Sequence, residues 1–217
     1  MMSRSEDVAA ALAHLRAADP VMRELIRRAG PFALKLRRQR FLMLVYSIIA
    51  QQISRNAARS IRKRLHEHLA PARITPERLA RETIPSLRRA GLSKQKAAYL
   101  LDLARKVQAG EVRLAGLHRL GDEAIIGELI RVHGIGVWTA QMFLMFSLGR
   151  PDVFPHGDLG IRSALRNLYG LRELPDRETA HEIARPWRPY ATVASWYCWR
   201  SLELPKEEKP PEPQQWM

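Results

Sequence analysis

Apolar residues recur at spacings of three and four along almost all of this chain, and the strict alternation typical of strands is scarce. Proline and glycine fall between the periodic stretches, where helices end and begin. The pattern therefore predicts an all-α protein. The helices it predicts are 6–17, 21–29, 39–51, 55–68, 76–82, 84–90, 94–108, 122–132, 137–147, 158–169, 177–184 and 189–204. Because segment 41–50 is apolar on nearly every side, we expect it at the centre of a helical lobe.

The composition limits the possible partners. The 217 residues can form one large helical lobe or two closely packed ones. Their 36 Lys and Arg against 22 Asp and Glu give a net charge of +14, which favours a polyanion but does not separate DNA from RNA or an anionic membrane.

Cys198 is the one cysteine, so neither an intramolecular disulfide nor a metal site built from cysteines is expected. The first residues lack an export signal and no apolar run could span a bilayer, so we expect an intracellular protein without a membrane partner.

The most informative local motif is VHGIGVWTA at residues 132–140, which predicts a helix, a tight turn and a second helix over about 122–147. Glycine at 134 and 136 lets the chain reverse sharply and brings bare backbone N–H groups to the surface. The first amides of the second helix have no partners within that helix and suit a phosphate. Read alone, the two glycines fit an ordinary corner between helices better than a phosphate site.

Asp158 follows Gly157 at the start of another predicted helix, where the commonest role of aspartate is to cap the helix. Aromatic residues accompany it in the sequence, with Trp138 after the turn and four rings in segment 190–199. Such rings can stack a base turned out of a duplex, and a carboxylate can then stabilise positive charge at C1′ of the sugar. Core packing is the alternative role for the aromatic segment.

Two polar turns are further candidates for contact with a polyanion. Residues 51–54 (QQIS) follow the central apolar helix, as a functional loop or as a helix end with Ser54 capping the next helix. Residues 91–96 (GLSKQK) offer a second backbone phosphate contact or a solvated start of a helix.

The order of these motifs resembles the helix-hairpin-helix (HhH-GPD) DNA glycosylases, and within them the alkylated-base branch, the 3-methyladenine DNA glycosylase II type. The resemblance covers residues 10–204 and is carried by segments 48–54, 91–97, 134–140 and 152–158. It implies an all-α fold of two lobes with the active-site cleft between them. The expected division is 1–36 with 151–204 as one lobe, 37–150 as the other, and 205–217 as a disordered tail.

The resemblance also implies roles for individual residues. Asp158 matches the catalytic carboxylate, and Gln52 the wedge that fills the gap left by the flipped base, where many relatives have leucine. His133 replaces the proline usual before the hairpin. The expected base pocket consists of Trp138, Trp196, Met142 and Leu159, of which Met142 and Leu159 replace aromatic residues of some relatives. The expected DNA contacts are Gly134, Ile135, Gly136, Thr139, Gln51, Gln52, Ser54, Gly91 and Lys94.

The predicted reaction is hydrolysis of the N-glycosidic bond of alkylated purines such as 3-methyladenine and 7-methylguanine. Trp138 stands where bifunctional relatives have a nucleophilic lysine, and no lysine lies between 107 and 205, so we expect base removal without strand cleavage. One alternative is a glycosylase for neutral lesions such as hypoxanthine or ethenoadenine. Another is a non-catalytic protein that keeps the hairpin only to bind DNA.

The resemblance also bears on cofactors, on the DNA partner and on the cellular compartment. No cofactor is expected, apart from the monovalent cation that some relatives bind at the hairpin carbonyls, and no metal is expected in catalysis. The expected partner is double-stranded DNA with damaged bases, bound by a monomer in the nucleoid-containing cytoplasm or in the nucleus.

Overall fold

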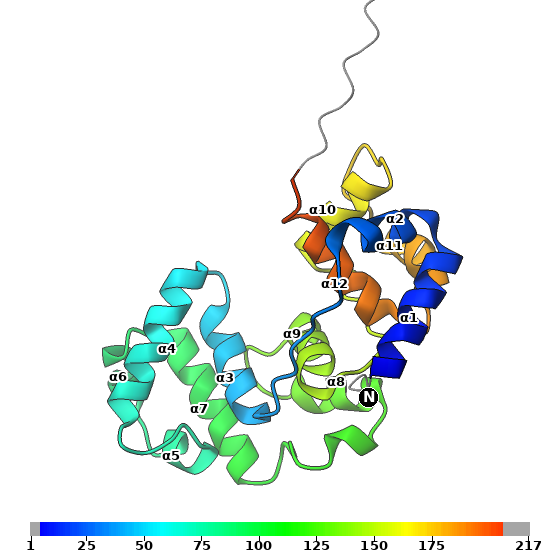
Figure 1. Cartoon of the computed structure of the whole chain (residues 1–217). Helices are drawn as coiled ribbons and strands as arrows, with labels where there is room; N and C mark the ends of the chain where they lie inside the picture. The colour runs from blue at the N-terminus through cyan, green and yellow to red at the C-terminus, as the bar shows by residue number, and fades with distance from the viewer. Residues whose placement is uncertain (1–4, 206–217) are drawn as a thin grey trace, which may run out of the picture. The chain divides into compact units, whose positions relative to one another are not determined.

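The computed structural model describes residues 5–205, and this part of the chain contains helices and no strand (Figure 1). The chain divides into two compact units, of which unit 1 comprises residues 34–155 and unit 2 comprises residues 5–33 with 156–205 of the described part. The unit boundaries lie a few residues from the lobe boundaries expected at 36/37 and 150/151. The tail predicted at 205–217 lies outside the described residues, except for Pro205.

Unit 1 is built around one buried helix. Its helices are α3 (Arg40–Ala50), α4 (Arg55–Leu69), α5 (Pro76–Ala80), α6 (Ile84–Arg89), α7 (Lys94–Gln108), η1 (Leu117–Arg119), α8 (Asp122–Leu129), α9 (Val137–Phe143) and η2 (Leu144–Leu148). In α3 the side chains of Met43, Leu44, Val45, Ile48 and Ile49 are buried. The helix packs against α4, α7 and α9, as its apolar sequence predicts.

Polar contacts fix how α3, α4 and α7 meet. The Lys96 ammonium, in the first turn of α7, donates to the carbonyls of Ile49 (2.8 Å) and Gln51 (2.6 Å), where α3 ends. Burial lowers the pKa of Lys96. Ser54 caps α4 and Ser93 caps α7, each through its hydroxyl oxygen. Lys96 thus positions the loop at residues 51–54 from the start of another helix.

The predicted helix-hairpin-helix is present, with boundaries that differ from the predicted ones. Helix α8 ends at Leu129 rather than 132, because the amides of Val132 and Ile135 bond three residues back instead of four. The predicted helix 137–147 is an α-helix only to Phe143 and continues as the π-helix η2. In a π-helix each backbone hydrogen bond spans one residue more than in an α-helix. Apolar periodicity over so short a stretch does not reveal this difference.

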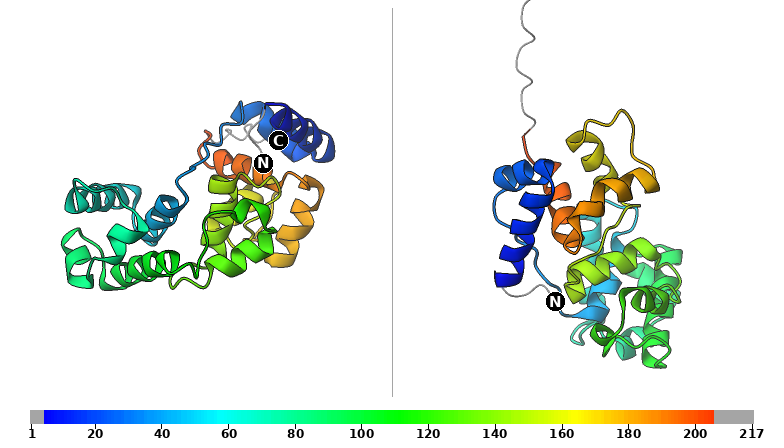
Figure 2. Two further views of the ribbon diagram at one scale, coloured as in Figure 1. Left: turned by 90° about the horizontal axis from the view of Figure 1, so that it is seen from below. Right: turned by 90° about the vertical axis from the view of Figure 1, so that its right-hand side faces the viewer.

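Unit 2 combines the N-terminal helices with the last third of the chain. Its helices are α1 (Ser5–Ala18), α2 (Pro20–Ala29), α10 (Leu159–Leu168), α11 (Arg177–Ala184), η3 (Arg185–Trp187) and α12 (Ala191–Ser201). Helices α1 and α2 pack on each other and on α12, which Figure 2 shows from two further sides. Buried Asp19 joins the two parts of the sequence, accepting hydrogen bonds from the Tyr169 hydroxyl and the Trp187 indole while capping α2.

Candidate functional site

Of the two glycines in the hairpin turn, Gly134 and Gly136, only Gly134 is required by the backbone and its surroundings. Gly134 has φ +82°, and a Cβ built on it would lie 2.1 Å from a ring carbon of Tyr99. Its carbonyl accepts a hydrogen bond of 2.7 Å from the Gln51 side chain. Gly136 has φ −96° and caps α9 with open space around it. The turn is therefore packed against α7 and the loop after α3 at Gly134 and exposed at Gly136.

An acidic side chain on α7 holds the start of the turn. Asp102 accepts hydrogen bonds from the His133 amide (2.8 Å) and the Lys106 ammonium (2.9 Å), and the His133 ring lies 3.2 Å away. Lys106 also donates to the Arg131 carbonyl at 2.6 Å. Partial burial by itself raises the pKa of Asp102, but the hydrogen bonds from His133 and Lys106 outweigh it and hold this pKa below its usual value. We call these three residues, Asp102, Lys106 and His133, the hairpin clasp.

The hairpin residues predicted to contact DNA divide into exposed and buried positions. Ile135 and Thr139 have 4% and 3% of their surface exposed, so their side chains pack inside unit 1. The Ile135 amide donates to the Val132 carbonyl within the turn. Gly136 and the first residues of α9 form the exposed part of this motif.

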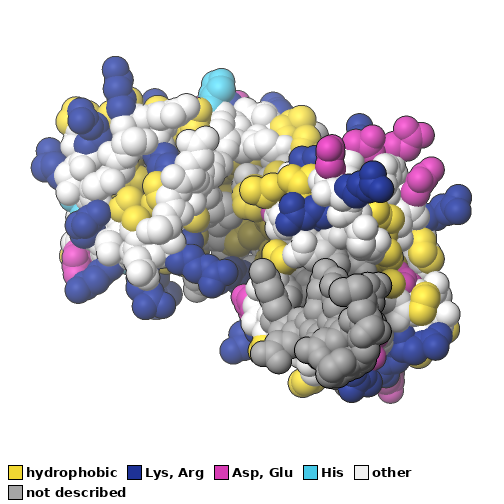
Figure 3. Space-filling view, turned by 90° about the horizontal axis from the view of Figure 1, so that it is seen from above, with side chains coloured by type: hydrophobic (Ala, Val, Ile, Leu, Met, Phe, Trp, Pro, Cys, Tyr) yellow, Lys and Arg dark blue, Asp and Glu magenta, His cyan; other side chains and the backbone are white. Residues whose placement is uncertain are grey.

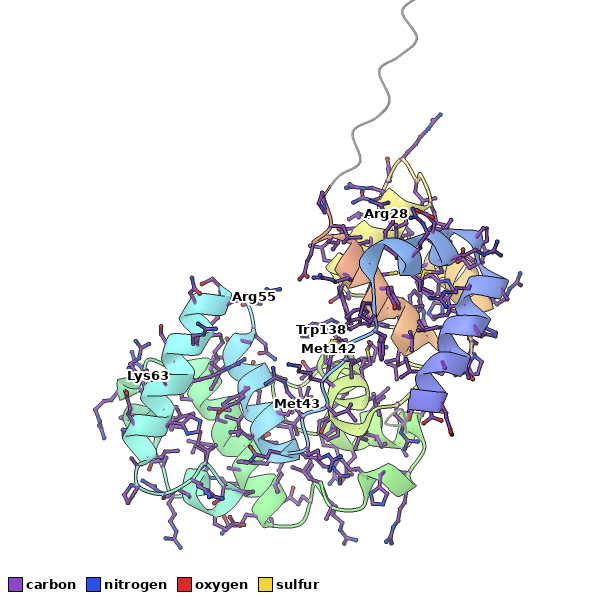
Figure 4. The ribbon with its side chains drawn as sticks, viewed as in Figure 1. Arg28, Met43, Arg55, Lys63, Trp138 and Met142 are labelled. Atoms are coloured by element: carbon purple, nitrogen blue, oxygen red, sulfur yellow. The ribbon has the colours of Figure 1, made fainter. Side chains whose placement is uncertain are left out.

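Two predicted pocket residues line one cavity, within unit 1. The cavity has a volume of 580 Å³ and lies between α3 and α9. Trp138, 44% exposed, and Met142, 8% exposed, lie on its α9 side, and Met43 on its α3 side. Figure 4 shows these three side chains pointing toward the space between the two helices. The cavity wall is mainly apolar and aromatic, as in most small-molecule sites.

Gln52 adopts a backbone conformation that side chains rarely take. It has φ +56°. Within residues 5–205 it is the only residue other than glycine with a positive φ. It is exposed and lines the same cavity as Trp138. A strained residue of this kind costs about 1–3 kcal/mol and tends to occur at functional positions.

The other predicted DNA contacts lie at helix starts, except Gly91, which follows the end of α6. Ser54 caps α4 by accepting a hydrogen bond from the Ala57 amide at 3.2 Å. Gly91 has φ +91° and lies against the Arg64 guanidinium, where a Cβ would come within 2.4 Å. Lys94 is the exposed first residue of α7. Ser54 and Lys94 therefore lie at helix starts, as expected. These positions are also compatible with the DNA contacts expected of them.

Asp158 is the N-cap of α10, in unit 2. Its Oδ1 accepts hydrogen bonds from the Ile161 amide (2.9 Å) and from the Trp199 indole (2.8 Å). Gly160 lets this arrangement form, because a Cβ there would lie 3.0 Å from both the carboxylate and the indole. The capping role expected from the sequence is therefore present, and it fixes the orientation of the carboxylate.

The late aromatic residues of unit 2 divide between core and partly exposed positions. Tyr197 is fully buried. Trp196 is partly exposed and meets Phe32 edge to face at 5.1 Å. Leu159, predicted in the base pocket, is 65% exposed. Tyr197 thus belongs to the core, and Trp199 donates a hydrogen bond to Asp158.

His156, two residues before Asp158, forms a pair with His181. The ring centroids lie 4.8 Å apart. Burial, aided by His181 and Arg177, lowers the pKa of His156, and burial with Arg177 and Arg188 lowers the pKa of His181. The pair is thereby biased toward its neutral form at neutral pH.

No cluster of three or more possible metal-binding side chains occurs in residues 5–205. In the hairpin, the carbonyls of Val132 and Gly134 already accept hydrogen bonds from the Ile135 amide and the Gln51 side chain. A cation at the hairpin carbonyls stays a prediction.

Within the same described range, residues 5–205, none of the helices has the length and apolarity needed to cross a membrane.

Helices α8 and α9, joined by the glycine turn beside an aromatic cavity, place the part of the chain that the structure describes in the class of helix-hairpin-helix proteins. Residues 45–189 match the family model described as "HhH-GPD superfamily base excision DNA repair protein", and the chain belongs to this family.

Several similar proteins align with most of this chain. DNA-3-methyladenine glycosylase 1 of Schizosaccharomyces pombe is 29% identical, over 92% of this chain and 90% of the relative. The solved S. pombe 3-methyladenine DNA glycosylase in complex with abasic DNA has a TM-score of 0.79 at 28% identity, covering 90% of this chain and 97% of that one. The DNA-3-methyladenine glycosidase of Bacillus halodurans has a TM-score of 0.79 at 35% identity, with 88% of each chain covered. With other curated relatives the chain spans about half of their length, 45% and 57% in two cases.

Several residues of the site were not predicted from the sequence. Trp199 bonds Asp158 across 41 positions, and Asp102 bonds His133 across 31. Lys96 belongs to the segment that carries the resemblance, but its role at the end of α3 follows only from the fold. Arg62 lines the cavity from α4, and its sequence context is that of an ordinary solvated cation.

Proposed function

We propose that this chain is a monofunctional DNA glycosylase that removes alkylated purines of the 3-methyladenine and 7-methylguanine type in base excision repair. The observation that carries the proposal is the Asp158 carboxylate, oriented by Trp199 and the first turn of α10. Membership of the HhH-GPD family and the names of the relatives support it.

An alkylated purine of this type carries positive charge before its bond to the sugar breaks. The base leaves as a neutral molecule, so no general acid has to protonate it, whereas sugar glycosidases normally need two carboxylates. One carboxylate is then sufficient to stabilise the positive charge that develops at C1′ and to position water. We assign this role to Asp158.

The aromatic cavity of unit 1 supplies a place for the extruded base. The face of Trp138 attracts a cationic ring by about 1–2 kcal/mol when water is excluded. Extrusion costs a few kcal/mol, and least for a base that already pairs poorly, which contributes to selection of damage. We assign to Gln52 the role of the side chain that fills the vacated position in the duplex.

DNA binding is proposed to combine backbone and side-chain contacts to phosphate. The exposed start of α9 offers amides at the positive end of a helix. Arg55, Arg59 and Lys63 repeat every fourth residue along the exposed surface of α4, directly after the loop that holds Gln52. Figure 3 shows Lys and Arg side chains spread over the part of the molecule that contains α4. We propose that a monomer acts on duplex DNA in the nucleoid or nucleus.

Strand cleavage is not expected, because the proposed site lacks the amine that forms a Schiff base with the sugar. Trp138 occupies the position of that lysine, and residues 107–205 contain none. The expected product is an intact abasic strand.

The proposal is tested by replacing Asp158 with asparagine, which has nearly the same shape and can still accept the hydrogen bonds from Ile161 and Trp199. Single-turnover release of bases from methylated duplex DNA is expected to fall at least a hundredfold, while affinity for DNA changes less than threefold. Asp176→Asn, at the cap of α11, is the matched control and is expected to keep activity. Undiminished base release by Asp158→Asn would show that the catalytic assignment is wrong.

The same reactions test the monofunctional assignment. The wild-type product should remain unbroken on a gel until alkali is added, and borohydride should trap no covalent complex. Nicking without alkali, or a trapped complex, would contradict the absence of lyase activity.

A further inference from the structure

The cavity that contains Trp138 and Met142 also has two cationic side chains in its wall. Arg37 and Arg62 both line it, and none of the residues described as lining it is acidic. Arg37 comes from the segment before α3, and Arg62 comes from α4. Two guanidinium groups at a mainly apolar cavity, whose other polar side chains are the neutral Ser47, Gln51 and Gln52, supply donors without a carboxylate to pair them.

The Arg62 guanidinium is held in place without using all of its donors. It stacks over the Tyr46 ring, 4.6 Å from the centroid, and Nη2 donates to the Tyr46 carbonyl at 3.2 Å. Its buried Nε has no hydrogen-bond partner. Burial and the neighbouring charge of Arg37 both lower the pKa of Arg62. A partly buried donor group of this kind is stabilised by a ligand that brings an acceptor.

Guanidinium groups only donate hydrogen bonds, so they distinguish bases by the groups at their edge. A guanine-type base offers the O6 carbonyl, which accepts from arginine, whereas an adenine-type base has an amino group that also donates. The positive charge disfavours both cationic lesions alike, because each carries one positive charge. The hydrogen-bond pattern therefore discriminates between them, and the charge does not.

We infer that Arg62, with Arg37 beside it, is a specificity residue that favours alkylated guanine over alkylated adenine by donating to the base carbonyl. The inference rests on the proposed function, since it concerns the same cavity and reaction. As the bond to the sugar breaks, electrons flow into the base, so the hydrogen bond to O6 strengthens toward the transition state. The preference should accordingly appear in the rate of release.

Duplex DNA treated with a methylating agent tests this inference, because it contains 7-methylguanine and 3-methyladenine together. The two released bases are separated by chromatography, and the ratio of their release rates is independent of the active fraction of the enzyme. Arg62→Met is expected to shift the ratio at least fivefold toward 3-methyladenine, and Arg62→Lys, which keeps a donor, less. Arg89→Met, an exposed position at the end of α6, is the control and should leave the ratio unchanged.

Each outcome decides one claim. A ratio within twofold of wild type in Arg62→Met would overturn the inference, including the case in which both rates fall together because Arg62 binds a phosphate. Release of neither base by the wild type would instead overturn the proposed function. If Arg62→Met does not fold, inhibition of the wild type by the free bases decides the question, with stronger inhibition by 7-methylguanine expected and equal inhibition contradicting it.

Discussion

Gly134 and Gly136 lie two residues apart in one turn and carry different constraints. Gly134 combines left-handed backbone with contact to the Tyr99 ring, and its carbonyl receives the Gln51 side chain. Gly136 has an ordinary φ and open space beside it. The first position is fixed by packing within unit 1, and the second is available to a ligand that approaches the backbone closely.

The two glycines therefore make a matched pair of substitutions. Gly134→Ala is expected to lower the free energy of unfolding by about 1–3 kcal/mol, because its Cβ must displace Tyr99 and hold a strained φ. Gly136→Ala should cost less than about 1 kcal/mol, since alanine is only a poorer N-cap than glycine. Urea unfolding measures both, and binding to a short duplex shows whether Gly136→Ala weakens DNA contact. Equal losses of stability would show that the turn is not packed as described.

At the level of elements, the hairpin clasp joins the turn to α7 through one carboxylate. Asp102 receives the His133 amide and the Lys106 ammonium, and Lys106 also bonds the Arg131 carbonyl next to α8. His133 stands where the resemblance leads one to expect proline, which has no N–H to donate. In this chain the amide of His133 is a structural donor.

Asp102→Asn is expected to reduce the stability by about 1–2 kcal/mol, because the charged acceptor of two donors is lost. Since the pKa of Asp102 is lowered on folding, its stabilisation is complete above the unfolded value of about 3.8 and is lost as the pH falls through the folded value. Unfolding midpoints of wild type and Asp102→Asn should therefore differ at pH 7 and converge under strongly acidic conditions. His133→Ala keeps the amide and should lose less. A difference that persists in acid would contradict the role of the charge.

Over the full sequence, positive charge is the property most relevant to DNA. The net charge of +14 is accompanied by a sequence pI near 10.8. Charge of this size accelerates encounter with a polyanion and supports binding that does not depend on sequence. It does not select damaged bases, a role that we propose for the cavity and for Asp158.

Binding to an undamaged duplex is accordingly expected to weaken steeply with salt. If about four phosphates are contacted, affinity falls about a hundredfold between 50 and 200 mM salt. Fluorescence anisotropy at several salt concentrations gives the slope, and Arg55→Gln should reduce the slope by about one. A flat salt dependence would rule out the proposed phosphate contacts.

The sequence predicts most of the helices, because apolar periodicity and caps such as Ser54, Ser93 and Asp158 are encoded within a few residues of each helix. It also indicated the hairpin, since Gly134 and Gly136 are local signals. The π-helix after Phe143 was missed because its hydrogen bonds run one residue further than the sequence period shows.

Which side chains act together depends on the tertiary fold. Trp199 reaches Asp158, Asp102 reaches His133, and Arg62 reaches the cavity of Trp138 because folding brings distant segments into contact. A sequence pattern reports which face of a helix is apolar, but not which neighbour that helix meets. Partner choice depends on packing and desolvation of the whole unit, so these contacts have no local signature.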